Sequence, residues 1–367
     1  MKALFVLDAR FAASERGLLR RLSIGLSSEG VEVTFLCPPS VAGAISEGML
    51  SSVIAANVEA GQLERWSAKR VIRESLTAAG LDECDVVHAF GGKSIAMAAE
   101  IARGMDALLA VEVWRARMAP RLRATLDAHG FKHGAAVRPL VLCVPSSLIA
   151  KRLEEAGINA GIRVTPWGVH APAPPETPAG AARRNQAIVF AGRGLDGKRY
   201  LAAFDAVCSL ARERPNVLLF VDAVASHRLQ LWKRVVASGL QSRVTLVGDL
   251  EATRDAALAA DLFVHPEARG ECRSILLDAM ATGACVIAAK DPDVSWIIGD
   301  ETAKVVRSDY SDGWRSAVTD VLDHTAVRED LRQRAFAHIR QHHTVSGYVT
   351  TTLDAYESTL AAHAQRS

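Results

Sequence analysis

The sequence predicts an α/β protein built from two doubly wound parallel-sheet domains with a ligand cleft between them. Short apolar runs of strand length alternate with segments of helical periodicity along almost the whole chain of 367 residues. The apolar runs are continuous, which is typical of parallel strands that helices cover on both faces. A proline-rich segment interrupts the alternation near the middle of the chain, and the alternation restarts after it.

The first half of the chain is predicted to hold seven strands with helices between them. A helix is expected after Ser14, because Leu18, Leu22 and Leu26 then share one face and Gly30 supplies a stop. The strands are expected near residues 3–7, 31–36, 51–55, 86–90, 107–113, 138–144 and 161–165.

Residues 171–185 are predicted to link the two domains, because each proline fixes φ and removes a hydrogen-bond donor, so that neither a helix nor a strand continues there. After the linker, six strands are expected near residues 187–191, 217–222, 243–247, 261–265, 284–288 and 303–307. Three helices are expected to close the chain, near residues 311–323, 327–342 and 346–363. Parallel sheets of this kind bind ligands beyond the carboxyl ends of their strands, so the site is expected in the loops that follow the strands.

Composition excludes several classes of protein. The 43 Lys and Arg residues nearly balance the 41 Asp and Glu residues, which argues against a nucleic-acid-binding protein. The six cysteines form no CxxC pair, so packed, reduced thiols and no metal centre are expected. The apolar run after Met1 is too short for a signal-peptide core, and no stretch approaches the roughly 20 apolar residues of a membrane span. A cytoplasmic protein is expected.

The loop after the first strand of the second half has the composition of a phosphate site. It reads Gly-Arg-Gly-Leu-Asp-Gly-Lys-Arg over residues 192–199, and a helical segment follows. Glycines allow backbone amides to approach a phosphate, a helix N-terminus favours an anion, and Arg193 and Lys198 supply two cations. On spacing alone, two solvated cations in a surface turn explain the same residues.

A second candidate segment runs from His265 to Gly283, out of a strand, through a polar loop and into a helix. Amides near Ser274 would be free at the start of that helix, and Asp278 could accept hydrogen bonds from sugar or ribose hydroxyls. The alternative interpretation is a helix whose apolar residues are core and whose Asp278 is merely solvated.

The sequence that carries these motifs resembles glycosyltransferase family 4. Members of this family are retaining enzymes of the GT-B architecture, which has two facing Rossmann-like domains. The resemblance is strongest over residues 187–306, and it rests on the segments FAGRGLDGK, VTLVGDLE, AADLFVHPEARGECRSILLDAMATGACVIAA and IIGDETAKVV. It implies retaining transfer of a sugar from a nucleotide-diphosphate donor to an acceptor that the sequence does not name, without a metal or cofactor. It also implies an acceptor domain at 1–170, the linker 171–185, a donor domain at 186–345 and a last helix, 346–367, that returns to the first domain.

The resemblance carries over residue by residue at four positions. Arg193 and Lys198 match the arginine and lysine that bind the donor diphosphate, where they would also neutralise the charge that grows as the glycosidic bond breaks. The amides around Gly248 lie where family members contact the nucleobase. Asp278 matches the motif glutamate that binds ribose hydroxyls, with a side chain one methylene shorter.

The sequence departs from the family at the donor-sugar loop. The first glutamate of the family's E-x7-E motif falls on Gly270, and the neighbouring Glu271 is expected to serve as the catalytic carboxylate in its place. The family's Gly-Phe-Gly turn is replaced by Glu271, Cys272 and Arg273, so the predicted donor loop runs from Gly270 to Ser274. These departures leave open an alternative function, a catalytically inactive homologue that acts as a binding or partner subunit.

The acceptor side is predicted from fewer signals. Trp114 and Arg115 lie near the position of the family's acceptor-side histidine. His88 is expected to end a strand that faces the cleft, where it could touch a substrate or be a hydrogen-bonded structural residue. The segment 115–138 is basic, so it could hold an anionic acceptor or rest on an anionic membrane, or be a solvated helix face. Asp291-Pro292-Asp293 is expected to be a solvated turn.

Overall fold

The computed structural model describes residues 1–47, 49–61, 64–131, 138–159, 161–171, 185–248, 260–307 and 309–365. The chain divides into two compact units. Unit 1 comprises residues 1–168 and 345–367, and unit 2 comprises residues 169–344. Apart from its two end residues, the linker predicted at 171–185 lies outside the described residues.

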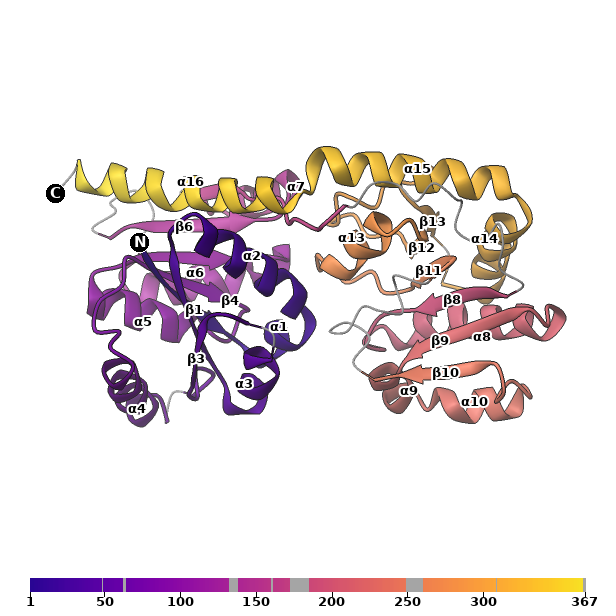
Figure 1. Ribbon diagram of the computed structural model, residues 1–367, viewed down its shortest axis with the longest axis horizontal. Coiled ribbons are helices and arrows are strands. Elements are labelled where there is room, and N and C mark those ends of the chain that lie inside the picture. The colour runs from indigo at the N-terminus through magenta and orange to yellow at the C-terminus, as the bar shows by residue number, and fades with distance from the viewer. Residues whose placement is uncertain are drawn as a thin grey trace. The chain divides into compact units, whose positions relative to one another are not determined.

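Unit 1 is built on a parallel sheet of seven strands in the order β3-β2-β1-β4-β5-β6-β7 (Figure 1). The strands are β1 (Lys2–Leu7), β2 (Glu32–Cys37), β3 (Ser52–Ala55), β4 (Val86–Phe90), β5 (Leu108–Glu112), β6 (Leu140–Val144) and β7 (Ile162–Val164). The central strands β4 and β5 are buried along their whole length, whereas the edge strands β3 and β7 are partly exposed. Continuous apolar runs therefore mark the strands that helices cover on both faces.

The helices of unit 1 cover this sheet, and the last helix of the chain is one of them. They are α1 (Ala9–Ser14), α2 (Arg16–Ser28), α3 (Pro39–Ser46), α4 (Arg65–Ala78), α5 (Ile95–Met105), η1 (Ala116–Met118), α6 (Ala119–Ala128), α7 (Ser147–Glu155) and α16 (Val345–Ala364). Helix α16 packs against α2 so closely that a Cβ at Gly25 would overlap Val349. Glycine at this position thus lets the end of the chain pack on its beginning.

Unit 2 holds a parallel sheet of six strands in the order β10-β9-β8-β11-β12-β13 (Figure 1). The strands are β8 (Gln186–Phe190), β9 (Val217–Asp222), β10 (Val244–Val247), β11 (Leu262–His265), β12 (Cys285–Ala289) and β13 (Lys304–Val306). The described helices are α8 (Gly197–Glu213), α9 (Ala223–Leu229), α10 (Leu231–Ala237), α13 (Ser274–Ala281), α14 (Ser311–Asp323) and α15 (Thr325–His342). The strand order reverses between β8 and β11, which is where doubly wound sheets bind ligands.

The α/β class and the thirteen predicted strands are confirmed, most of them within one or two residues at each end. All six cysteines are free and buried, as expected from their spacing. Within the described ranges, no helix is both long and apolar enough to cross a membrane.

Candidate functional site

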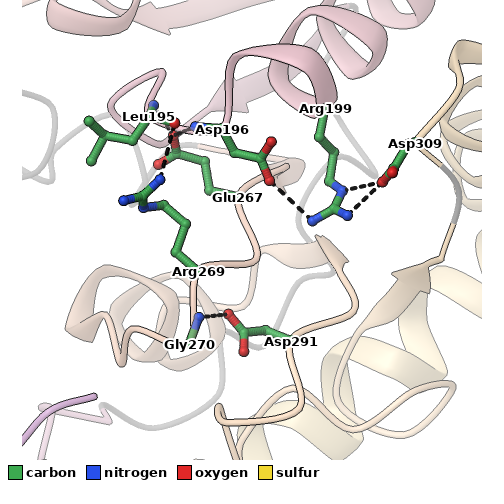
Figure 2. Close-up of polar contacts among 8 residues, drawn as sticks. All are labelled: Leu195, Asp196, Arg199, Glu267, Arg269, Gly270, Asp291 and Asp309. Carbon is green, nitrogen blue, oxygen red and sulfur yellow. Dashed lines mark hydrogen bonds and ion pairs between the residues drawn. The ribbon is translucent and has the colours of Figure 1, made fainter. Parts of the chain in front are cut away.

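Three loops at the carboxyl ends of neighbouring strands lie together in unit 2, and we call them the loop cluster. They follow β8, β11 and β12 and span residues 192–197, 266–273 and 290–293. Nη1 of Arg269 donates to the carbonyl oxygen of Leu195 at 3.1 Å, and the N–H of Gly270 donates to Oδ2 of Asp291 at 2.7 Å (Figure 2). The middle loop is therefore hydrogen-bonded to both of its neighbours.

The glycine-rich loop after β8 is held by the side chain of Glu267. Its carboxylate accepts the backbone N–H of Arg193 at 3.0 Å, that of Asp196 at 3.1 Å and that of Leu195. Burial raises the pKa of Glu267, but His265 and the three N–H donors lower it by more, so the carboxyl stays ionised. Three backbone amides of the predicted phosphate loop therefore bind an internal carboxylate.

The two predicted cations remain at the edge of this loop. Arg193 is half-buried, and its carbonyl oxygen accepts from Nη1 of Arg228 at 2.7 Å. Lys198 is exposed in the first turn of α8, with Nζ 5.4 Å from the ring centre of Tyr310. The neighbouring Arg199 is engaged with two carboxylates of unit 2 instead (Figure 2). The structure therefore places Arg193 and Lys198 beside a helix N-terminus at the switch point, a position that favours an anion.

Helix α13 carries the predicted ribose ligand. Seven of its eight residues are buried, and Asp278 is the exception. The apolar residues of this helix belong to the core, as the alternative interpretation predicted. Asp278 is the residue of the helix that is partly exposed. Ser274 begins the helix and is fully buried, and Arg273 precedes it with 4% of its surface exposed.

The rest of the predicted donor loop is also largely buried. Glu271 is 5% exposed, with Oε1 3.7 Å from Nε of Arg269, and Cys272 is fully buried. Gly270 has a φ of +64°, a backbone conformation that favours glycine. Gly248 is exposed just after β10, and residues 249–259 of the predicted nucleobase loop lie outside the described residues.

Asp291 corrects the expectation of a solvated turn at residues 291–293. Asp291 is 7% exposed and accepts the N–H of Gly270 and, at 3.1 Å, the N–H of Asp293. Burial raises the pKa of Asp291, although these N–H groups oppose the shift. Sequence reasoning missed both Asp291 and Glu267, because their partners lie 21 to 74 residues away along the chain.

The acceptor-side candidates lie in unit 1. His88 is fully buried within β4, where Nδ1 is 2.6 Å from the hydroxyl of Tyr356, and burial lowers its pKa to about 3. This is the structural role that the sequence left open beside a substrate contact. Trp114 is 2% exposed, and guanidiniums of Arg10 and Arg115 lie 5.6 and 4.8 Å from the centre of its ring. Of the three candidates, Arg115 is the one that is partly exposed.

Part of the basic segment predicted at 115–138, residues 132–137, lies outside the described residues. Among the residues that the structure does describe, no group of three or more His, Cys, Asp or Glu side chains could hold a metal ion.

Solved structures that match these two parallel-sheet units have the GT-B fold. The HepE protein of Anabaena, solved in complex with UDP-glucose, aligns with a TM-score of 0.75 at 15% identity, covering 98% of this chain and 100% of HepE. Sucrose-phosphate synthase of Thermosynechococcus elongatus aligns with a TM-score of 0.74 at 14% identity, covering 99% of this chain and 100% of that one. At these identities the likeness defines the class of fold, which is GT-B.

The sequence of unit 2 resembles a known family. The family model described as glycosyl transferases group 1 matches residues 185–324. A curated relative, the lipopolysaccharide core biosynthesis glycosyltransferase LpsE of Rhizobium meliloti, is 25% identical over 190 residues. That match covers 51% of this chain and 52% of LpsE, so the chain spans about half the length of this relative.

Proposed function

We propose that the protein is a retaining glycosyltransferase that transfers a sugar from a nucleotide-diphosphate donor to an acceptor. The observation that carries this proposal is the position of Arg193 and Lys198. Both lie beside the N-terminus of α8 at the switch point of the sheet, inside the segment that the family model matches. Two cations and a helix dipole at one place suit a diphosphate.

In the proposed reaction, Arg193 and Lys198 bind the diphosphate and stabilise the negative charge that it gains as the glycosidic bond breaks. Asp278 accepts hydrogen bonds from the ribose hydroxyls, and the amides near Gly248 contact the base. Glu271 is the proposed catalytic carboxylate. We propose no metal or cofactor, because the two side-chain cations supply the charge that the leaving group requires.

The donor and acceptor are proposed by chemical class. HepE has been solved with UDP and with UDP-glucose, which makes UDP the first nucleotide to test. LpsE is named for lipopolysaccharide core synthesis, which supports a glycan or lipid-linked acceptor. Arg10 and Arg115, stacked on Trp114, would suit an anionic group on that acceptor. A cytoplasmic protein in peripheral contact with an anionic membrane, through the basic segment that begins at Arg115, fits this class of acceptor.

One observation favours a second candidate function, a non-catalytic partner subunit. Glu271, the carboxylate expected to replace the acidic residue missing at Gly270, is 5% exposed. A protein of this kind could bind a nucleotide and leave its sugar untouched. Hydrolysis of a nucleotide sugar separates the two functions, because only a catalyst releases free sugar.

The experiment that tests the proposal is calorimetry with UDP, GDP, ADP and TDP. We expect the wild type to bind at least one of them. The Arg193→Ala/Lys198→Ala double variant should bind it at least tenfold more weakly, since each charge-assisted contact contributes about 1.5–3 kcal/mol.

A matched control is the Arg212→Ala/Lys233→Ala double variant, which removes two exposed cations of unit 2 that lie outside the loop cluster. It should bind the nucleotide like the wild type. Absence of heat from all four nucleotides overturns the proposed function. Unchanged affinity in the Arg193/Lys198 variant overturns the assignment of these two residues.

A further inference from the structure

The space beside Gly270 is filled by a carboxylate from the neighbouring loop. A Cβ built on Gly270 would lie 2.6 Å from Oδ2 of Asp293 and 3.5 Å from its Cγ. Carbon atoms do not approach an oxygen that closely without displacing it, and the φ of +64° at Gly270 disfavours a side chain in any case. The Asp293 carboxylate therefore stands where a side chain of residue 270 would begin.

Asp291 holds this arrangement in place. Its buried carboxylate accepts the N–H of Gly270 through Oδ2 at 2.7 Å (Figure 2). The same carboxylate accepts the N–H of Asp293 through Oδ1 at 3.1 Å. One side chain thus ties the backbones of both loops together. The position of Asp293 relative to Gly270 is consequently set by hydrogen bonds and does not depend on a flexible turn.

Asp293 differs from the carboxylates around it in its exposure. Asp291 is 7% exposed, Glu271 is 5% exposed and Glu267 is 6% exposed, whereas Asp293 is partly open to solvent. A ligand that enters the loop cluster can therefore reach Asp293 more readily than these three side chains.

The hydrogen bonds of the loop cluster connect Asp293 with the proposed diphosphate ligands. Glu267 accepts the backbone N–H of Arg193. Arg269 donates to the carbonyl oxygen of Leu195 in the same loop (Figure 2). The strand order places the loops after β8, β11 and β12 next to one another at one edge of the sheet. A sugar attached to a diphosphate at Arg193 would accordingly be presented to the other two loops.

We propose that the Asp293 carboxylate binds hydroxyl groups of the donor's sugar and so determines which sugar is accepted. This inference rests on the proposed function. A carboxylate offers two acceptor oxygens, which match a pair of neighbouring hydroxyl donors, and a site built to bind a hydroxyl rejects sugars that lack it. Asp291 is a positioning residue, since it acts through Gly270 and Asp293.

The test measures how much the sugar adds to nucleotide affinity. Calorimetry is run with matched pairs, UDP and UDP-glucose, GDP and GDP-mannose, ADP and ADP-glucose, and TDP and TDP-glucose. The wild type should bind one nucleotide sugar more tightly than its nucleotide. In Asp293→Asn the ratio of the affinity for the nucleotide sugar to that for the nucleotide should fall by about tenfold or more, as expected for loss of a charge-assisted hydrogen bond. The affinity for the nucleotide alone should stay within about twofold of the wild type.

Two further variants keep the result interpretable. Asp293→Ala removes the carboxylate without crowding Gly270, so it should lose the gain as Asp293→Asn does. Glu301→Gln, at an exposed acid of unit 2 outside the loop cluster, is the matched control and should retain the gain. Thermal unfolding of each variant verifies that unit 2 is folded.

The outcomes separate the two proposals. If no nucleotide binds the wild type, the proposed function and this inference fall together. If the nucleotide binds and Asp293→Asn retains the full gain, or the wild type binds nucleotide and nucleotide sugar equally, this inference alone is overturned.

Discussion

The carboxylates of Glu267 and Asp291 each accept hydrogen bonds from backbone N–H groups of a neighbouring loop. Burial raises the pKa of both carboxyls. The pKa of Glu267 lies below its usual value because His265 and three N–H donors outweigh burial. The pKa of Asp291 lies above its usual value because burial outweighs its N–H donors. Glu267 consequently stays ionised to lower pH than an ordinary glutamate, and its carboxylate holds the loop that carries Arg193.

Replacing Glu267 tests this anchor. Glu267→Gln should destabilise unit 2 by about 1–3 kcal/mol, because the amide NH2 meets backbone N–H groups that lose their acceptor. Urea denaturation at neutral pH measures the change. Glu301→Gln, at an exposed acid of the same unit, is the control and should change stability by less than about 0.5 kcal/mol. Equal stability of the Glu267 variant and the wild type would contradict this role.

The sequence indicates candidate residues of the site, but it does not indicate the contacts among them. Arg193 and Lys198 are five positions apart in one loop, so their proximity is a local property that spacing reveals. The bond from Glu267 to Arg193 spans 74 residues, and it depends on β8 and β11 being neighbours in the sheet. No local pattern encodes such a contact, and for the same reason the turn that holds the buried Asp291 was expected to be solvated.

At the scale of elements, α16 is joined to the sheet of unit 1 through a buried polar group. The hydroxyl of Tyr356 lies 2.6 Å from Nδ1 of His88, and Nε2 of His88 lies 3.7 Å from Oε2 of Glu112. Trp167 donates to Oε1 of Glu112 at 2.7 Å. Burial raises the pKa of Glu112 to about 8 and lowers that of His88 to about 3, so both groups are neutral near pH 7.

These shifts predict a pH dependence of stability. The folded state binds a proton at Glu112 between the unfolded pKa of 4.5 and about 8, so the stability from this group is lost as pH rises through that window. His88 acts oppositely, but only between about 3 and 6.5. From pH 6.5 to 8.5, the free energy of unfolding measured in urea should therefore fall in the wild type.

Glu112→Gln is the matched variant, because a glutamine still accepts from Trp167 and does not titrate. It should lack the component of the fall that comes from Glu112 between pH 6.5 and 8.5. Parallel pH profiles for the wild type and Glu112→Gln would show that Glu112 is ionised in the folded protein over this range.

Secondary structure was predictable because it is encoded locally. Continuous apolar runs located the buried central strands. The edge strands β3 and β7 have shorter apolar stretches and are partly exposed. The sequence periodicity did not reveal the close packing of Gly25 on Val349, which joins segments more than 300 residues apart.

At the scale of the whole molecule, the two units repeat one construction. In each, the first strand of the unit is the third strand from one edge of a parallel sheet, and the strand order reverses beside it. In unit 2, Arg193 and Lys198 lie where the strand order reverses. In unit 1, Arg10 and Arg115 follow β1 and β5. A donor site in one unit and an acceptor site in the other is the division of labour that we propose.

The most direct measurement of this account is donor hydrolysis. The protein is incubated with UDP-, GDP-, ADP- and TDP-sugars without an acceptor, so that water takes the sugar and the nucleoside diphosphate leaves. We predict slow release of free sugar with retained anomeric configuration from at least one donor, reduced at least tenfold in Arg193→Ala/Lys198→Ala. No release from any nucleotide sugar that the protein binds would contradict the enzyme and favour the non-catalytic partner subunit.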